Sequence, residues 1–254
     1  MKYTAIVLAG SRPGRDAFAE RYGTDLKALI PIAGEPMVRR PVSALLASAA
    51  VGRIVVLSQS PERIAAALDA DDRLVCRPSR GTIAETLLEL CDDQQTAWPL
   101  LVTTADHALL SAAMVDEFVA AAAGADVAVG VVERSVLLRR FPDAQRTWLR
   151  FRGGGYTGAN LFVLSSPAVR PAIELWRSVE QDRKKAWRVL SLLGPVTLLC
   201  IVLRLVSLAE VMKQLSERLR LNAIAVQLSD PLAGVDVDKP ADHALVEAIL
   251  AAKA

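Results

Sequence analysis

We expect the rest of the chain to be organised around the stretch Ala5–Met37, AIVLAGSRPGRDAFAERYGTDLKALIPIAGEPM. Its first five residues are apolar, and a short apolar run of this kind is typical of a buried parallel strand. Gly10 ends the run, and an irregular segment with two arginines follows. A glycine after a first strand lets backbone N–H groups approach a phosphate chain, because no Cβ stands in the way. We expect Arg12 and Arg15 to bind phosphate oxygens through forked donors, with Lys27 as a point charge.

Short motifs in this stretch resemble the signature of the nucleotidyltransferases: Leu8-Ala9-Gly10, Arg15, Lys27-Ala28-Leu29 and Gly34-Glu35-Pro36-Met37. The resemblance is to the superfamily that includes the molybdenum-cofactor guanylyltransferases and the sugar- and alcohol-phosphate cytidylyl- and uridylyltransferases. The chain has Ser11 where a second glycine is usual, and a longer gap between Arg15 and Lys27. The pattern is neither a P-loop nor a dinucleotide-binding fingerprint. The alternative is a strand-to-helix turn with solvated arginines.

The length of the chain fits one large α/β domain or one domain with an insertion. The chain has 254 residues, 52% of them hydrophobic, which is enough for a sizeable core. Its net charge of +2 argues against a general electrostatic grip on nucleic acid. The cysteines, Cys76, Cys91 and Cys200, lack metal or redox spacing, so a reducing, cytoplasmic setting is expected. The first apolar run is too short for a signal peptide.

Predicted strands and helices alternate along the chain. The strands are expected at 5–9, 53–58, 74–76, 99–104, 126–132, 160–164 and 223–228, with helices at 38–51, 61–68, 82–90, 111–123 and 240–252. This alternation predicts an α/β fold with a doubly wound, mostly parallel sheet. The resemblance implies a glycosyltransferase-A-like nucleotidyltransferase fold over residues 1–254, with a mainly helical insertion at about 168–221. Ligands of such sheets bind at the carboxyl edge, where Gly10, Gly81 and Asp106 are expected.

Asp106 is the first candidate metal ligand. It follows the predicted strand 99–104, and carboxylate oxygens suit Mg²⁺, which also binds substrate phosphates. An aspartate after a strand is also a common turn or capping residue. The neighbouring His107 is expected to be structural.

The second candidate lies in the segment 234–242, GVDVDKPAD, which resembles the closing motif of the family. The resemblance implies that Asp238 binds Mg²⁺ together with Asp106, although Lys239 replaces the usual threonine. On a strand, Asp236 would lie on the same face as Asp238 and serve as its companion. The alternative is that Asp238 and Asp242 only cap the last helix.

The segment 77–87 resembles the base-binding turn of the family. Backbone amides of Gly81 and Thr82 are expected to read the nucleobase, although helix capping explains Thr82 equally well. Asn160 is assigned to the acceptor substrate or, alternatively, to a turn. The residues assigned to the nucleotide are Leu8, Ala9, Gly10, Ser11, Arg12, Arg15, Lys27, Arg80, Gly81 and Thr82.

The resemblance implies transfer of a nucleoside monophosphate from a nucleoside triphosphate, CTP being favoured, to a sugar or alcohol phosphate, with release of pyrophosphate. Lys27, Arg15 and Asp106 are the expected catalytic residues, and Mg²⁺ the expected cofactor. Two other functions stay open: a glycosyltransferase that uses a nucleotide sugar, and a non-catalytic nucleotide-binding protein. A glycosyltransferase of this fold would need a central Asp-x-Asp, and the pair Asp236/Asp238 comes too late in the chain for that role.

The segment Trp176–Leu208 is the least like a minimal nucleotidyltransferase. A basic, tryptophan-bearing part leads into the apolar run Val189–Leu203, which contains Gly194-Pro195 and is too short to span a bilayer. The run is expected to be core of the helical insertion, a homodimer interface, or a surface that touches a membrane.

Overall fold

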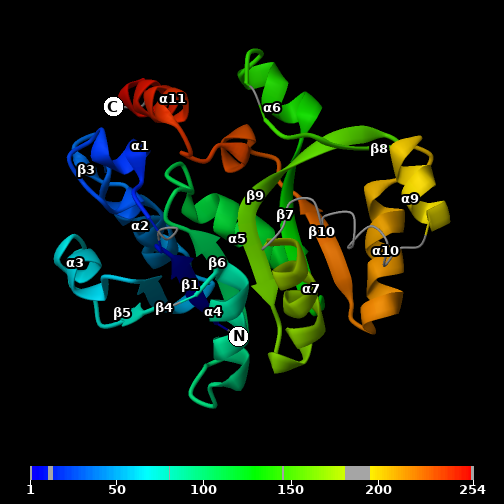
Figure 1. Cartoon of the computed structure of the whole chain (residues 1–254), viewed down its shortest axis with the longest axis horizontal. Coiled ribbons are helices and arrows are strands. Elements are labelled where there is room, and N and C mark those ends of the chain that lie inside the picture. Colours follow the sequence, from blue (N-terminus) through cyan, green and yellow to red (C-terminus); the bar gives the residue numbers. More distant parts are fainter. Residues whose placement is uncertain (1, 11–13, 80, 145, 181–194, 253–254) are drawn as a thin grey trace.

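One sheet of eight strands forms the centre of the protein. The computed structural model describes residues 2–10, 14–79, 81–144, 146–180 and 195–252 (Figure 1). Along the sheet the order is β10 (Ala223–Gln227), β7 (Val127–Glu133), β9 (Gly154–Leu164), β6 (Leu100–Thr104), β1 (Tyr3–Leu8), β4 (Val51–Ser58) and β5 (Leu74–Pro78), and β8 (Leu149–Phe151) pairs with β9.

The sheet is mostly parallel, as predicted. β9 runs antiparallel to both of its neighbours, β6 and β7, so the other strands along the sheet all point the same way. β9 is also longer than the predicted strand 160–164, since it begins at Gly154. Glycines at its start carry no side chains, and the sequence therefore shows no alternation of polar and apolar residues there.

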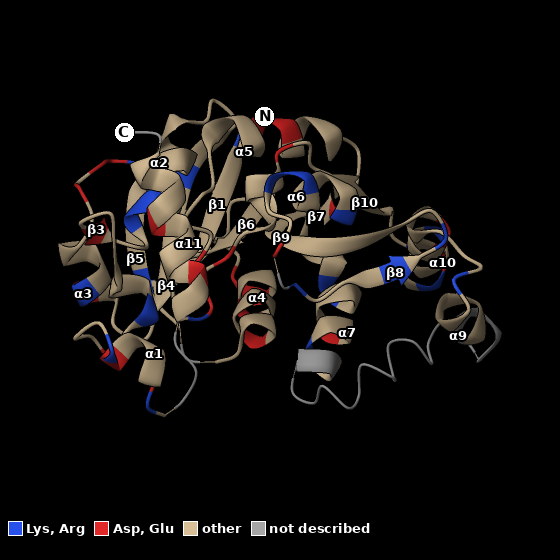
Figure 2. Ribbon diagram, turned by 90° about the horizontal axis from the view of Figure 1, so that it is seen from above, with Lys and Arg blue, Asp and Glu red and all other residues tan. Residues whose placement is uncertain are grey.

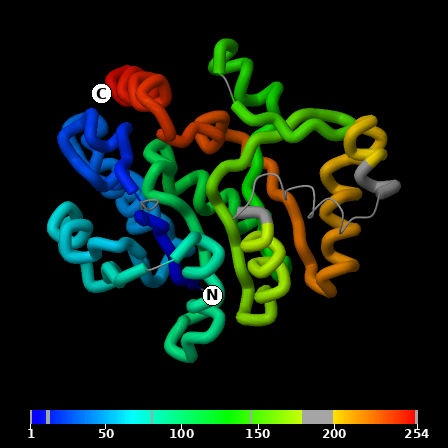
Figure 3. The backbone as a smooth tube through the Cα atoms, in the orientation of Figure 1, coloured from blue at the N-terminus to red at the C-terminus, as the bar shows by residue number. Residues whose placement is uncertain are grey.

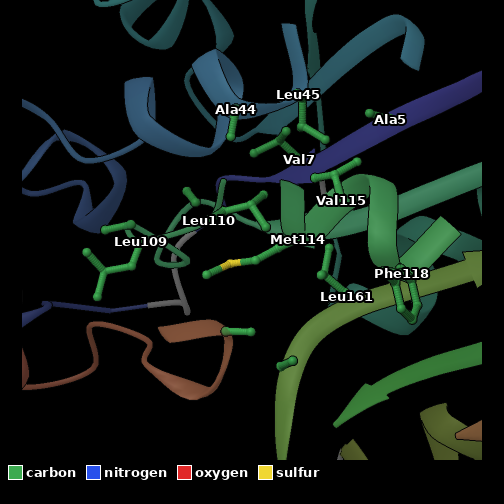
Figure 4. Close-up of a cluster of buried hydrophobic side chains, with 14 of the residues drawn as sticks. Ala5, Val7, Ala44, Leu45, Leu109, Leu110, Met114, Val115, Phe118 and Leu161 are labelled. Atoms are coloured by element: carbon green, nitrogen blue, oxygen red, sulfur yellow. The ribbon is translucent and has the colours of Figure 1, made fainter. Parts of the chain in front are cut away.

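Helices cover both faces of the sheet. Side chains of β1 alternate, so that Val7 belongs to one apolar cluster and Ile6 to the other. The first cluster packs against α2 (Arg39–Ala47), α5 (Ala112–Ala121) and α11 (Pro240–Ala251), and Figure 4 shows Leu45, Met114 and Phe118 in it. The second packs against α4 (Ile83–Asp92) and α7 (Arg170–Glu180). The chain is therefore a three-layer α/β/α sandwich.

The C-terminal segment returns to the N-terminal one. The 3-10 helix η4 (Pro231–Gly234) and α11 run across one end of the sheet toward the blue N-terminal segments in Figure 3. There α11 lies against the short hairpin of β2 (Pro31–Ile32) and β3 (Glu35–Pro36), and the His243 imidazole is 2.8 Å from the Pro31 carbonyl oxygen. The two ends of the sequence thereby meet at the carboxyl edge of the parallel strands.

The predicted helical segment 168–221 contains three described helices. α7 packs on the sheet, with the Trp176 ring centroid 4.9 Å from that of Phe162, and α10 (Leu208–Leu219) lies beside β10. α9 (Pro195–Val202) lies farther out, next to α10 and the end of β8 (Figure 1). Of the apolar run, residues 189–194 lie outside the described part. No helix in that part is both long and apolar enough to cross a membrane.

Short elements complete the described structure: α1 (Ala17–Glu20), η1 (Lys27–Leu29), α3 (Pro61–Ala66), α6 (Arg134–Arg140) and η2 (Pro167–Val169).

Candidate active site

Lys27 joins two carboxylates from distant parts of the sequence. Its ammonium nitrogen Nζ lies 2.6 Å from Asp106 Oδ2 and 2.6 Å from Asp238 Oδ1. The predicted convergence of these three side chains at the carboxyl edge of the sheet is confirmed. Their roles in binding and catalysis stay predictions.

Each of the three side chains is positioned by a different kind of local structure. Lys27 begins the short 3-10 helix η1, and Asp106 follows the buried strand β6, where the Thr104 hydroxyl donates to Asp106 Oδ1. The backbone joins Asp106 to the closing motif, because the Val237 N–H donates to the Asp106 carbonyl oxygen at 3.1 Å. The Asp238 N–H in turn donates to Asp242 Oδ2 at 3.2 Å.

The Lys27 cluster is charged and open on one side. Burial lowers the pKa of Lys27, but the two carboxylates raise it, and the net pKa lies above the usual lysine value. Lys27 and Asp106 are about one-fifth exposed, whereas the Asp238 side chain is 63% exposed. Solvent, or a ligand, therefore reaches the cluster from the side of Asp238.

A second cation lies beside this cluster, and the sequence did not single it out. The Arg146 guanidinium pairs with the Asp236 carboxylate and lies 3.5 Å from Asp242 Oδ1. Asp242 Oδ2 also accepts from the N–H groups of Asp238 and Lys239, so this aspartate caps α11 as one alternative predicted. Burial raises the pKa of Asp236, and the Arg146 charge opposes that rise.

The expectation that Asp236 and Asp238 share one face of a strand is wrong. Residues 235–238 form no strand, and the two carboxylates have different partners, Arg146 and Lys27. The two carboxylates lie close enough for the negative charge of Asp238 to add to the rise in the pKa of Asp236.

Arg15 does not lie in the cluster. Its guanidinium pairs with Glu20, the last residue of α1, with Nε 2.7 Å from Oε1, and the Arg15 side chain is 87% exposed. The expected binding of phosphate oxygens by Arg15 stays a prediction, and in this conformation its guanidinium is engaged with Glu20. Ser11, Arg12 and Arg80 lie outside the described residues. Gly10 is exposed at the carboxyl end of β1, after the buried Leu8 and Ala9.

Thr82 opens α4 through a reciprocal cap. Its hydroxyl accepts from the Glu85 N–H at 3.3 Å, and Glu85 Oε2 accepts from the Thr82 N–H at 2.8 Å. A Cβ on Gly81 would lie 2.7 Å from Glu85 Oε2, so the cap fits closely against this glycine. The Thr82 amide that was expected to read a base is already engaged, and a ligand would have to displace Glu85 to reach it.

Asn160 lies in β9 at a shift of the pairing with β7, in the left-handed conformation with φ of 47°. Leu161 pairs with Thr103 of β6, which places Asn160 level with the end of β6 and hence near the edge that carries Asp106.

His107 is buried, and burial lowers its pKa to about 4, so the imidazole is neutral at pH 7. This agrees with the structural role expected for it.

A lysine and two carboxylates thus lie at the carboxyl edge of a mostly parallel α/β sheet, the edge at which sheets of this kind bind their ligands. Residues 5–196 match the model of the MobA-like NTP transferase domain, and the chain belongs to this nucleotidyltransferase family.

Known relatives agree with this assignment. The chain is 35% identical over 132 residues to 2-C-methyl-D-erythritol 4-phosphate cytidylyltransferase from Bordetella petrii, a match that covers 49% of this chain and 56% of that relative. It resembles a hypothetical transferase from Thermus thermophilus at 33% identity and a TM-score of 0.80, over 96% of this chain and 100% of the other. The fold also resembles CMP:2-keto-3-deoxy-manno-octonic acid synthetase complexed with CTP, at 13% identity and a TM-score of 0.61, over the full length of both chains.

Proposed function

We propose that the protein transfers a nucleoside monophosphate from a nucleoside triphosphate to a phosphorylated small molecule and releases pyrophosphate. The observation that carries the proposal is the Lys27–Asp106–Asp238 cluster, which lies at the ligand-binding edge of the sheet in a chain of the NTP transferase family. The Lys27 ammonium at this edge attracts the negative charge of a triphosphate. The triphosphate can approach from the exposed side of the cluster, at Asp238.

The reaction is an in-line displacement. An oxygen of the acceptor phosphate forms a bond to the α-phosphorus, and the bond from that phosphorus to the bridging oxygen of pyrophosphate breaks. The attacking phosphate is already an anion, so the site needs no general base. The Lys27 ammonium, whose pKa is raised, stays protonated and neutralises charge that builds on the α-phosphate.

The donor set fits Mg²⁺. Asp106 and Asp238, which are far apart in the sequence, already direct carboxylate oxygens at one cation, the Lys27 ammonium. Among the residues that the structure describes, no group of three or more His, Cys, Asp or Glu side chains gathers as a metal site. The two carboxylates suit Mg²⁺, which binds through one or two carboxylates together with substrate phosphates and water. When bound, Mg²⁺ would neutralise negative charge on the phosphates.

CTP is the proposed nucleotide, and a sugar or alcohol phosphate the proposed acceptor. The support is the relative from Bordetella petrii, whose name specifies cytidylyl transfer to an alcohol phosphate, and a fold neighbour solved with CTP. The other three nucleotides are outcomes of the test below.

The test is to incubate the purified chain with each of the four nucleoside triphosphates, Mg²⁺ and a panel of sugar and alcohol phosphates. Pyrophosphate and the nucleoside diphosphate adduct are measured by ³¹P NMR and mass spectrometry, with Lys27→Ala as the control. Equal amounts of pyrophosphate and adduct that depend on Lys27 support the proposal. Transfer of sugar from a nucleotide sugar would assign a glycosyltransferase instead. Nucleotide binding without turnover on any acceptor would favour a non-catalytic protein.

A further inference from the structure

The end of the molecule that carries α9 exposes large apolar side chains. Four of them follow one another closely, and a fifth lies on β8; together they form the α9 patch: Leu149, Leu199, Val202, Leu203 and Leu205, each 54–61% exposed. Single exposed leucines are ordinary on a protein surface, but a group of them marks a site of contact. Leu199, Val202 and Leu203 belong to the apolar run 189–203, and the expectation that the run is core is therefore wrong for these three residues.

Two segments far apart in the sequence build the patch. The Arg152 N–H, just after β8, donates to the Val206 carbonyl oxygen at 2.8 Å, so β8 is fixed to the chain that leads from α9 to α10. Figures 1 and 2 both show α9 beside the end of β8 and α10, at an outer edge of the molecule. The patch is therefore formed by segments that are hydrogen-bonded to each other, and it lies away from the core of the sheet.

Arginines lie next to the patch in the sequence, together with Glu210, whose side chain is 46% exposed. Arg150 and Arg204 are exposed next to the patch, whereas the Arg152 guanidinium is engaged with Glu210 at 2.7 Å. The sequence from Pro195 to Ala209 contains no acidic residue. An apolar surface with an arginine rim of this kind suits a partner that is apolar inside and anionic outside.

A second copy of the chain suits the patch less well. In a two-fold contact the patch would face itself, and the arginines of the two rims would meet like charges. Five partly exposed side chains also present only a few hundred Å², below the roughly 800 Å² per partner of a stable protein interface.

We propose that the α9 patch binds the surface of a membrane that contains anionic lipid. α9 then lies in the plane of the interface, with Leu199, Val202, Leu203 and Leu205 among the acyl chains and with arginines at the headgroups. The eight residues of α9 are too few to cross a bilayer. This contact is separate from nucleotidyl transfer, which the cluster around Lys27 performs elsewhere on the molecule.

The test is flotation of the full chain with vesicles of phosphatidylcholine, with and without about one-third phosphatidylglycerol. We expect binding to the anionic vesicles, and at least a tenfold loss of partitioning in Val202→Glu/Leu203→Glu. The matched control is Ala120→Glu/Ala121→Glu, which places the same two charges at the exposed end of α5 and should bind like the parent. Arg204→Glu should weaken binding more than Arg139→Glu, an exposed arginine on α6.

Melting temperatures show that the variants fold, and light scattering reports their mass. A parent chain that stays in solution with anionic vesicles overturns the proposal, and so does equal binding by the α9 and α5 variants. A dimer that Val202→Glu/Leu203→Glu dissociates would also overturn it and would assign the patch to a subunit interface. None of these measurements uses catalysis, so failure of the proposed reaction leaves them valid.

Discussion

Two cation–carboxylate clusters lie side by side at the carboxyl edge, and they differ in exposure. Lys27 holds Asp106 and Asp238, and the latter is 63% exposed. Arg146 holds Asp236 and Asp242, whose side chains are 29% and 9% exposed, and Arg146 itself is 10% exposed. One short motif, Asp236-Val237-Asp238, therefore supplies a carboxylate to each cluster. The exposed cluster is available to a ligand, whereas the buried one fixes the backbone that carries Asp238.

The largest expected effect is on turnover in Lys27→Ala. Loss of a charge that stabilises the transition state should lower kcat by about 10²–10³-fold. Stability in Mg²⁺ should change little, and binding of the divalent ion alone should tighten, because Lys27 no longer competes for Asp106 and Asp238. Steady-state kinetics and metal titration measure both. Lys213→Ala, an exposed lysine on α10, is the control, and normal turnover in Lys27→Ala would make Lys27 merely a structural partner.

In the buried cluster, by contrast, we expect substitution to lower stability. Arg146→Ala leaves two carboxylates without their cation, and we expect a loss of about 3 kcal/mol in the free energy of unfolding, because Asp236 still reaches some solvent. Arg146→Lys should fall between the parent and Arg146→Ala, since one ammonium cannot replace the guanidinium fork. Urea unfolding measures this, with the exposed Arg140→Ala as control. Equal stability of Arg146→Ala and Arg140→Ala would show that the Arg146 cluster does not stabilise the fold.

The sequence predicted the exposed cluster but not the buried one, for physical reasons. Alternating strands and helices force parallel strands, and parallel strands bring their carboxyl ends to one edge, so Gly10, Gly81 and Asp106 were placed correctly. Arg146 is one of six arginines in the segment 134–152, which has no periodicity that would single out a buried one. The pairing of Arg15 with Glu20 depends on the local loop conformation, which no motif specifies.

Asparagine substitutions in the closing motif distinguish the roles of the two clusters. Asp238→Asn removes a carboxylate from the exposed cluster and should weaken Mg²⁺-dependent nucleotide binding by about 10–100-fold. Asp236→Asn should change that affinity less than tenfold and should act mainly on stability, through Arg146. Calorimetric titration with and without Mg²⁺ separates the two variants. The reverse pattern would mean that Asp236 is the metal-binding aspartate of the motif.

The smallest expected effects come from two helix caps, one at the site edge and one remote. Thr82 and Ser207 each form the same reciprocal cap, with Glu85 and Glu210. Replacing either by alanine should cost about 1 kcal/mol of stability, because the N–H at the third helical position loses its acceptor. Only Thr82→Ala should also change nucleotide affinity, because only Thr82 lies at the carboxyl edge beside β5. Thermal unfolding and nucleotide titration of both variants test this. If nucleotide affinity is the same in both variants, Thr82 caps α4 and does nothing for the base, and base recognition must come from other residues.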